Sequence, residues 1–274
     1  MRSNRYEVTM ASKDGVNWKT LGFTEFIHHS SGLSIFKNRI WSIGGLDDGY
    51  HSLKSALVFS TPDGIHWQRE QDLPYLVSAT DSYVLNDQLW ITGGFNGVAS
   101  SSSSTTIDGT SWAVGSAGIS GLFDMHSIVS DGTSAWLLGG RSASPTFTTR
   151  VFRTSDGLAW TSVGNLPAGR YNGSAALFNG ALWYAGGEYS GGVSNAVFTS
   201  TNGSNWTQTA NLPETRNMGA LLGFKGALLY IGGSSGSAKT NVWASSDGRS
   251  WTHIANLPYP HTGHAVIFPL CDSN

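Results

Sequence analysis

An apolar run that ends on two adjacent glycines recurs five times along this chain. One copy, Leu182 to Gly187, reads Leu-Trp-Tyr-Ala-Gly-Gly. The first glycines of the five copies are Gly44, Gly93, Gly139, Gly186 and Gly232. They lie 49, 46, 47 and 46 residues apart. A nearly constant spacing of this length indicates a repeat architecture, in which each repeat is one supersecondary unit.

A second pattern repeats in step with the first. It consists of an aspartate or asparagine, a glycine, and a tryptophan three residues after the glycine. Its six copies begin at Asp14, Asp63, Asp108, Asp156, Asn202 and Asp247. Ten of the eleven tryptophans belong to one pattern or the other, so we interpret tryptophan here as mainly structural. Two independent patterns with one period predict one continuous array and a single domain, residues 1–274.

Each repeat predicts four short strands. In the fourth repeat the expected strands are residues 173–178, 181–185, 196–200 and 206–209. Asn179-Gly180 and Asn202-Gly203 separate strands within this repeat, and both predict tight two-residue hairpins because these residues tolerate a positive φ. The run Ser102 to Ser104 predicts a polar strand, since Trp112 follows it at the usual distance. No segment has sustained helical periodicity, so we expect almost no helix.

The two ends of the chain match incomplete repeats. Residues 1–21 match a third and fourth strand, residues 22–258 hold five full repeats, and residues 259–274 match a first strand followed by a poor second one. We therefore predict an all-β, six-bladed β-propeller, with five full blades and one incomplete blade shared between the termini. Closing a ring in this way removes the free sheet edges.

The pattern resembles the Kelch repeat over essentially the whole chain. The resemblance rests on an aromatic residue three positions before the Gly-Gly, a later tryptophan, and a Leu-Pro followed by a basic residue that opens the next blade. The Leu-Pro copies with their basic residues are Leu166-Pro167 with Arg170, Leu212-Pro213 with Arg216, and Leu257-Pro258 with His261. Leu73-Pro74 departs from this pattern, with Val77 at the basic position. The resemblance implies a β-propeller, a fold that hosts both binding modules and enzymes.

Composition and charge exclude several classes of function. The formal net charge is −2, so bulk electrostatics predict neither a nucleic-acid partner nor a membrane-surface partner. No apolar run approaches the roughly 20 residues of a membrane span. Cys271 is the only cysteine, which excludes an intrachain disulfide and a cysteine-built zinc site. Without any recognised ligand spacing, P-loop or dinucleotide fingerprint, we expect no metal and no cofactor. Charged residues make up only 12% of the chain, a balance more common on secreted or particle-surface proteins.

The expected strand order divides the loops between two faces. Turns between strands one and two, and between strands three and four, share one face and are short. The post-glycine loops and the inter-blade Leu-Pro loops share the other face, which we call the Leu-Pro face, and they are longer and more varied. Variable loops on a rigid scaffold commonly carry function. We therefore expect the binding surface on the Leu-Pro face, around the propeller axis.

Register selects candidate ligand-binding residues on that face. Arg170 and Arg216 lie 46 residues apart, His261 follows 45 later, and counting back from Phe36 gives His28. Together they predict a cationic mouth for carboxylates, which arginine binds bidentately. In Kelch adaptors, arginines at this place hold acidic partner motifs, and the resemblance implies the same here. In the other interpretation, the arginines pair with acids or carbonyl groups and only hold loops in place.

The post-glycine loops add aromatic and charged candidates to this surface. The candidates are Phe95, Arg141, Glu188 and Tyr189, with Asp47, Asp48, Tyr50 and Asn96 beside them. Aromatic rings next to fixed charges suit a sugar or peptide ligand.

Two functions fit these residues. The first is a non-catalytic binding module for an acidic peptide, a protein or a carbohydrate, with no catalytic residue. The alternative is an enzyme resembling the bacterial Kelch sialic acid mutarotases, a mutarotase or epimerase of an acidic sugar. There an axial arginine would hold the carboxylate, and Glu188 or a histidine would move the proton. We favour the binding module, because propeller mouths bind more often than they catalyse without cofactors.

Overall fold

The computed structural model describes residues 7–24, 28–47, 53–98, 100–119, 124–142 and 146–262. These residues form β-strands joined by turns and loops, with no helix among them. The strands assemble into five four-stranded antiparallel sheets, or blades, each of which follows the order of the chain.

The strands of the five blades have the following bounds. Blade 1 contains β4 (Gly32–Phe36), β5 (Arg39–Ile43), β8 (Val58–Thr61) and β9 (Gln68–Arg69). Blade 2 contains β10 (Asp81–Leu85), β11 (Gln88–Thr92), β12 (Ser102–Thr106) and β13 (Ala113–Ser116). Blade 3 contains β14 (Ser127–Ser130), β15 (Ala135–Leu138), β16 (Arg150–Thr154) and β17 (Thr161–Asn165). Blade 4 contains β18 (Tyr171–Phe178), β19 (Ala181–Tyr189), β21 (Ala196–Ser200) and β22 (Thr207–Asn211). Blade 5 contains β23 (Ala220–Phe224), β24 (Ala227–Ile231), β25 (Lys239–Ser245) and β26 (Thr252–His261).

Smaller elements accompany the blades. In blade 4, β20 (Gly192–Val193) pairs with the end of β19. A three-stranded sheet combines β3 (His28–His29), β6 (Leu46–Asp47) and β7 (Leu53–Lys54) beside blade 1. The strand predicted from the serine run is confirmed as β12.

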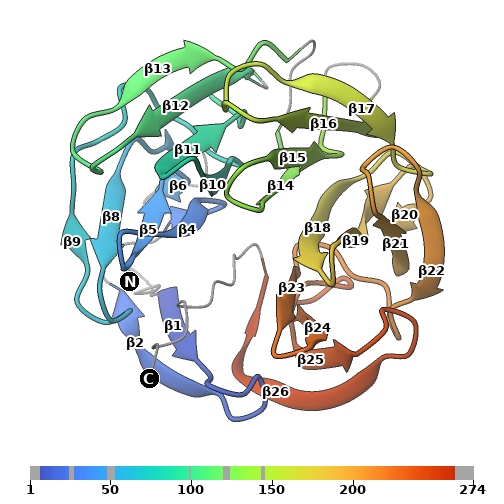
Figure 1. The fold of residues 1–274 in the computed structure, drawn as a ribbon. Coiled ribbons are helices and arrows are strands. Elements are labelled where there is room, and N and C mark those ends of the chain that lie inside the picture. Colours follow the sequence, from blue (N-terminus) through green and yellow to red (C-terminus); the bar gives the residue numbers. More distant parts are fainter. Residues whose placement is uncertain are drawn as a thin grey trace.

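The blades stand around a common axis, with β4, β10, β14, β18 and β23 facing the centre (Figure 1). The sheet of β1 (Glu7–Ala11) and β2 (Lys19–Thr24) lies between blades 5 and 1. It is placed there by Gly15, which abuts Leu229 of blade 5, and by Gly64 of blade 1, which abuts Thr9 and Leu21. The propeller fold is thus confirmed with five complete blades, and β1 and β2 stand at the sixth position. The closing strand predicted in residues 263–268 lies outside the described residues.

The hydrophobic core is divided into clusters between adjacent blades. One cluster joins Tyr83, Leu85 and Trp90 of blade 2 to Leu137 and Phe152 of blade 3. Equivalent clusters lie between blades 1 and 2, 3 and 4, and 4 and 5, and the last joins blade 5 to the β1–β2 sheet. Blades 2 to 5 therefore bury both of their faces against their neighbours, as is usual for the units of a repeat array.

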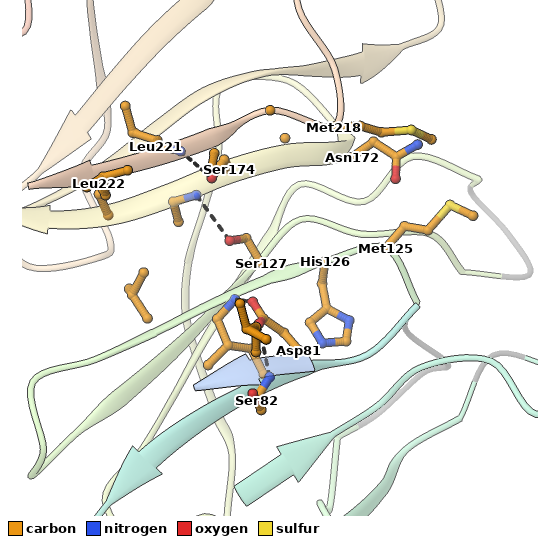
Figure 2. Close-up of a pocket in the computed structure, with 18 of the residues that line it drawn as sticks. Asp81, Ser82, Met125, His126, Ser127, Asn172, Ser174, Met218, Leu221 and Leu222 are labelled. Carbon is orange, nitrogen blue, oxygen red and sulfur yellow. Dashed lines mark hydrogen bonds between the residues drawn. The ribbon is translucent and has the colours of Figure 1, made fainter. Parts of the chain in front are cut away.

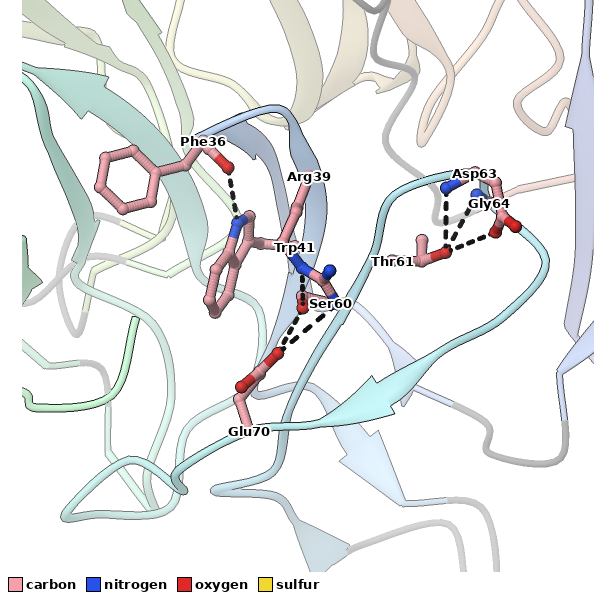
Figure 3. Close-up of polar contacts among 8 residues, drawn as sticks. All are labelled: Phe36, Arg39, Trp41, Ser60, Thr61, Asp63, Gly64 and Glu70. Atoms are coloured by element: carbon pink, nitrogen blue, oxygen red, sulfur yellow. Dashed lines mark hydrogen bonds and ion pairs between the residues drawn. The ribbon is translucent and has the colours of Figure 1, made fainter. Parts of the chain in front are cut away.

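A contact between the two sequence patterns holds each pair of blades in register. The large side chain of the Gly-Gly pattern in one blade packs on the glycine of the Asp-Gly pattern in the next. The pairs are Trp41 with Gly109, Trp90 with Gly157, Trp136 with Gly203, Trp183 with Gly248, and Leu229 with Gly15. The indole N–H of Trp41 also donates to the carbonyl oxygen of Phe36 at 2.9 Å, which fixes the ring (Figure 3).

The Asp-Gly turns are longer than the sequence predicts. In blade 1, β8 ends at Thr61 and β9 begins at Gln68, so the expected two-residue hairpin is wrong. Side chains supply the hydrogen bonds instead: the Thr61 hydroxyl accepts from the Gly64 N–H at 3.0 Å and donates to the Asp63 carboxylate at 2.9 Å (Figure 3). The same carboxylate accepts from the N–H groups of Ile65 and His66. The pKa of Asp63 is held well below its usual range, mainly by the His66 imidazole, whose Nδ1 lies 2.6 Å from the carboxylate, and then by these backbone N–H groups.

The turns between first and second strands match the prediction better. Both central residues have a positive φ in Lys37-Asn38, Asn86-Asp87, Asn179-Gly180 and Lys225-Gly226. This conformation is that of a type I′ hairpin.

The interlocking of tryptophan and glycine can be tested with Gly248→Ala. A methyl group there would overlap the Trp183 ring, and φ is +69°. The matched control is Gly180→Ala, where φ is +72° and a methyl group would meet nothing within 4 Å. We expect the control to cost about 1 kcal/mol of unfolding free energy, from backbone strain alone. Gly248→Ala should cost about 3 kcal/mol or more, because overpacking is added. Urea denaturation measures both, and equal losses would contradict the role given to the ring contact.

Candidate functional site

Equivalent backbone positions bring the predicted residues to the Leu-Pro face. The second glycine of a doublet donates its N–H to the residue that opens the next blade. The bonds run from Gly45 to Val77 (2.8 Å), Gly140 to Arg170 (2.7 Å), Gly187 to Arg216 (2.8 Å) and Gly233 to His261 (2.9 Å). The equivalence of Arg170, Arg216 and His261, and the departure at Val77, are therefore as predicted from the spacing.

A chain of backbone hydrogen bonds surrounds the axis two residues further on. The N–H of each member after the first donates to the carbonyl oxygen of the member in the preceding blade, which gives four bonds at 2.8–3.2 Å. The five members, all with a positive φ, are Ser30, Ala79, Met125, Asn172 and Met218. We call these five residues the rim.

Below the rim lies a central cavity of about 380 Å³, lined by the first strands of all five blades (Figure 2). Its wall is held together by side chains that reach the next blade. Asp81, Ser127 and Ser174 accept hydrogen bonds from the backbone N–H groups of Ile128 (2.8 Å), Ala175 (3.0 Å) and Leu221 (2.8 Å). The volume lies within the range of about 300–1,000 Å³ that small-molecule sites occupy.

Asp81 and His126 are the titratable groups among the described residues that line the cavity. Burial raises the pKa of Asp81 to about 6, against the lowering effect of hydrogen bonds from the Ile128 and Ser82 N–H groups. Burial also lowers the pKa of His126 to about 4, so its imidazole is neutral at pH 7. Asp124 and the Thr92 backbone carbonyl counteract part of this lowering of the pKa. His126 is 8% exposed, and neither ring nitrogen makes a well-aligned hydrogen bond in the described part of the chain.

Register explains why a histidine fits at position 126. Blades 4 and 5 have Gly173 and Gly219 there, because the rings of Tyr184 and Tyr230 fill the space that a Cβ would need. Blade 3 has Leu137 at the place of those tyrosines, so no tyrosine ring requires a glycine at position 126.

Three of the predicted loop residues occupy equivalent cross-strand positions. Phe95 lies opposite Ser78, Arg141 opposite Asp124, and Glu188 opposite Tyr171.

Arg141 is neutralised within its own pair. Its guanidinium donates two hydrogen bonds to the fully buried Asp124 carboxylate, at 3.0 and 2.7 Å.

Glu188 is held by neutral donors. Its carboxylate accepts hydrogen bonds from the Tyr171 hydroxyl (2.9 Å), the Asn172 amide (3.1 Å) and the Asn217 amide (2.6 Å). No basic side chain in the described ranges forms an ion pair with it. Tyr171 also stacks on Phe147, with ring centroids 5.3 Å apart, and its pKa is raised by burial and by Glu188. Glu188 is therefore a fixed acceptor beside the rim.

Arg170 and Arg216 occupy equivalent backbone positions, but their side chains contact different groups. Arg216 is 1% exposed, and its guanidinium binds the Glu214 carboxylate at 2.8 Å and the Asn241 side-chain oxygen at 3.1 Å. Two residues before Arg170 the chain has Ala168 where blade 5 has Glu214, so Arg170 lacks this counterion.

Arg170 lies against aromatic rings instead. It is 5% exposed, and its Cζ lies 5.2 Å from the ring centroid of Tyr189 and 5.0 Å from that of Phe198. Its Nε and Nη1 have no hydrogen-bond partner in the part of the chain that the structure describes. Burial lowers the pKa of this guanidinium. Arg170 and Arg216 reach the third strands of their own blades, at Phe198 of β21 and Asn241 of β25, and neither lines the central cavity.

The remaining predicted residues stand apart from this cluster. The backbone of His261 pairs with Lys239 at the end of β26, and that of His28 pairs with Asp47. The Phe95 ring lies 5.0 Å from the Lys54 ammonium. Asp48 and Tyr50 lie outside the described residues, as does Cys271.

Sequence reasoning missed several residues around the rim. The missed residues are Asp81, Asp124, His126, Tyr171, Asn172 and Asn217. The register that selected Arg170 could have found them, because Tyr171, Asn172 and Asn217 follow the two arginines directly.

Within the described ranges, no group of three or more histidine, cysteine, aspartate or glutamate side chains could hold a metal ion. No helix there is long and apolar enough to cross a membrane.

The arrangement of the sheets defines the chain as a β-propeller. No family model matches the chain, and no curated protein matches it in sequence. Among solved structures, that of YjhT has the same fold, with a TM-score of 0.71 and 18% sequence identity over 91% of this chain and 90% of that one. A likeness at this level of identity extends to the fold alone, and the Kelch resemblance continues to rest on the repeat motifs.

The raised pKa of Asp81 should make the free energy of unfolding depend on pH. Its pKa of about 6 in the folded protein lies above the value of about 3.9 in an unfolded chain. The stability linked to this group is therefore complete below about pH 4 and is lost as pH rises through about 6. Asp81→Asn keeps an acceptor for the Ile128 N–H and removes the charge. We expect this variant to be more stable than wild type by on the order of 1–2 kcal/mol at pH 8 and similar to it at pH 4.

Urea denaturation across this pH range measures the effect, with the exposed hairpin variant Asp87→Asn as control. A difference between Asp81→Asn and wild type that stays constant with pH would show that Asp81 titrates normally.

Proposed function

We propose that this protein is a non-catalytic binding module that holds an acidic ligand, a peptide or a carbohydrate, on the Leu-Pro face beside the rim. The observation that carries the proposal is the difference between the two equivalent arginines. Arg216 is neutralised by Glu214 and leaves only its Nε without a partner, whereas Arg170 leaves Nε and Nη1 without one and has no counterion among the described residues. A buried charge without a partner is unfavourable, and an anionic ligand group would relieve that cost.

The immediate surroundings of Arg170 support this role. Tyr189 covers the guanidinium from the solvent side and is itself 38% exposed, so rotation of one side chain would open the donors. The planar guanidinium suits a carboxylate, which it can bind through two parallel hydrogen bonds. In this proposal Arg216 holds its own Leu-Pro loop, in accordance with the second interpretation of the sequence.

The neighbouring Glu188 supports a ligand with two kinds of polar group. Glu188 lies near the end of β19, in the blade that Arg170 opens. The next residue is Tyr189, whose ring lies against Arg170. Its carboxylate accepts from hydroxyl or amide donors and repels a second anion. A ligand that combines one carboxylate with hydroxyl or amide groups therefore fits this surface better than a strongly acidic segment.

The proposal predicts the effect of giving Arg170 an internal counterion. Ala168→Glu places a carboxylate at the position that Glu214 occupies beside Arg216. We expect binding of acidic ligands to fall by about tenfold or more, because the new carboxylate competes for the guanidinium, while stability is kept or raised. An array of acidic peptides and acidic glycans identifies a ligand for wild type, and titration calorimetry then compares the variants.

The matched control is Glu214→Ala, which removes the counterion of Arg216. It should leave binding at Arg170 unchanged and lower the unfolding free energy by about 1–3 kcal/mol. If Ala168→Glu retains full affinity, Arg170 is not the ligand-binding group.

A second function is favoured by the position of Glu188 among three fixed donors. In that alternative the protein is a mutarotase or epimerase of an acidic sugar, with Arg170 holding the carboxylate and Glu188 moving the proton. Tyr171, whose hydroxyl donates to Glu188, would orient the carboxylate.

Anomer equilibration separates the alternative from the binding module. With sialic and uronic acids, NMR should show a rate above that of buffer alone, and Glu188→Gln should reduce the enzymatic part at least about a hundredfold. A rate equal to that of buffer for both sugars excludes this activity.

A further inference from the structure

The central cavity has an electrostatic character that differs from that of the surface around Arg170. Among its described lining residues are hydroxyl, amide and apolar side chains, one carboxyl group and one imidazole, and none is a lysine or arginine. The basic side chains nearest the rim are already in use or turned away, since Arg141 binds Asp124 and Arg170 lies against Tyr189 and Phe198. The Asp81 carboxyl thus faces the cavity and forms no ion pair within the described ranges.

Asp81 is bonded in a way that leaves acceptor capacity. One oxygen accepts from the Ser82 N–H at 2.9 Å and the other from the Ile128 N–H at 2.8 Å. Each carboxylate oxygen can accept more than one hydrogen bond. Asp81 is half-buried, and Figure 2 shows it with Ser82 in the cavity wall.

His126 provides a second, independent sign of a ligand. Buried polar groups are nearly always hydrogen-bonded, and each exception calls for an explanation. His126 lines the same cavity and is 8% exposed, and the Thr92 backbone carbonyl lies near its ring. Neither ring nitrogen makes a well-aligned hydrogen bond among the described residues. A neutral imidazole offers one acceptor and one donor to a bound molecule.

We propose that the central cavity binds a small organic cation that carries an ammonium group and a second polar group. The ammonium group donates to the Asp81 carboxylate, and the second group, a hydroxyl or an amine, bonds to the His126 imidazole. The cation replaces the missing counterion of Asp81, and the apolar side chains of Leu33 and Val129 contact its carbon chain. This site is separate from the anion site proposed at Arg170 and does not depend on it.

A pair of probes of equal size tests the charge. 4-Aminobutan-1-ol and butane-1,4-diol differ only in an ammonium group and a hydroxyl group. The amide signal of Ile128 reports on the site by ¹⁵N NMR, because this N–H donates to Asp81. We expect the amino alcohol to shift this signal with a millimolar dissociation constant, and the diol to bind about tenfold more weakly or less.

Variants assign the interaction to Asp81 and His126. In Asp81→Asn the two probes should bind equally weakly, whereas the exposed control Asp87→Asn should behave as wild type. His126→Phe, which fills the same space without nitrogen atoms, should weaken the amino alcohol several-fold. Equal binding of the two probes to wild type overturns the proposal, as does undiminished binding of the amino alcohol to Asp81→Asn. The absence of any shift at roughly 50 mM would overturn it as well.

Discussion

The structure depends on one contact, in which a large side chain of one blade occupies the space that a missing Cβ leaves in the next. Trp183 against Gly248 and Trp90 against Gly157 are examples. The contact joins the two sequence patterns, so their common period follows from geometry: a large side chain in each repeat, a tryptophan in four of the five, must meet a glycine in the following unit. Leu229 and Gly15 extend the same contact to the sheet of β1 and β2, and so join the N-terminal strands to blade 5.

The fold could be predicted from the sequence because its determinants are local and repeated. The glycine doublets, the Asp-Gly turns and the type I′ hairpin residues each mark one place in a blade. The turn predictions are wrong where side-chain groups, and not backbone carbonyl groups, accept the hydrogen bonds of the turn. At Thr61 and Asp63, two side chains satisfy the N–H groups of a six-residue turn, and an Asp-Gly dipeptide alone does not distinguish this turn from a two-residue hairpin.

The candidate site could be predicted only in part, for a physical reason. Repeat spacing determines backbone position, so the sequence predicts that Arg170 and Arg216 occupy equivalent positions in their blades. The direction of a side chain depends on what its neighbours leave empty, and that depends on contacts between strands. The Tyr184 ring fills the space beside Gly173, whereas blade 3 has Leu137 in place of that tyrosine and His126 in place of that glycine, and neither relation is visible in the spacing of either pattern. Repetition nevertheless gives an internal reference, because Arg216 with Glu214 shows what an arginine with a counterion looks like at the position of Arg170.

The rim has a consequence for how such a protein can change. Its five members are linked by four hydrogen bonds between main-chain N–H and carbonyl groups, so these bonds do not depend on which side chains project from the rim. Ala79, Met125 and Asn172 already show that chemically unrelated residues accept the same left-handed backbone. Side chains at the opening of the propeller can therefore be substituted, and ligand selectivity can change with them, while the main-chain hydrogen bonds and the blades beneath stay the same.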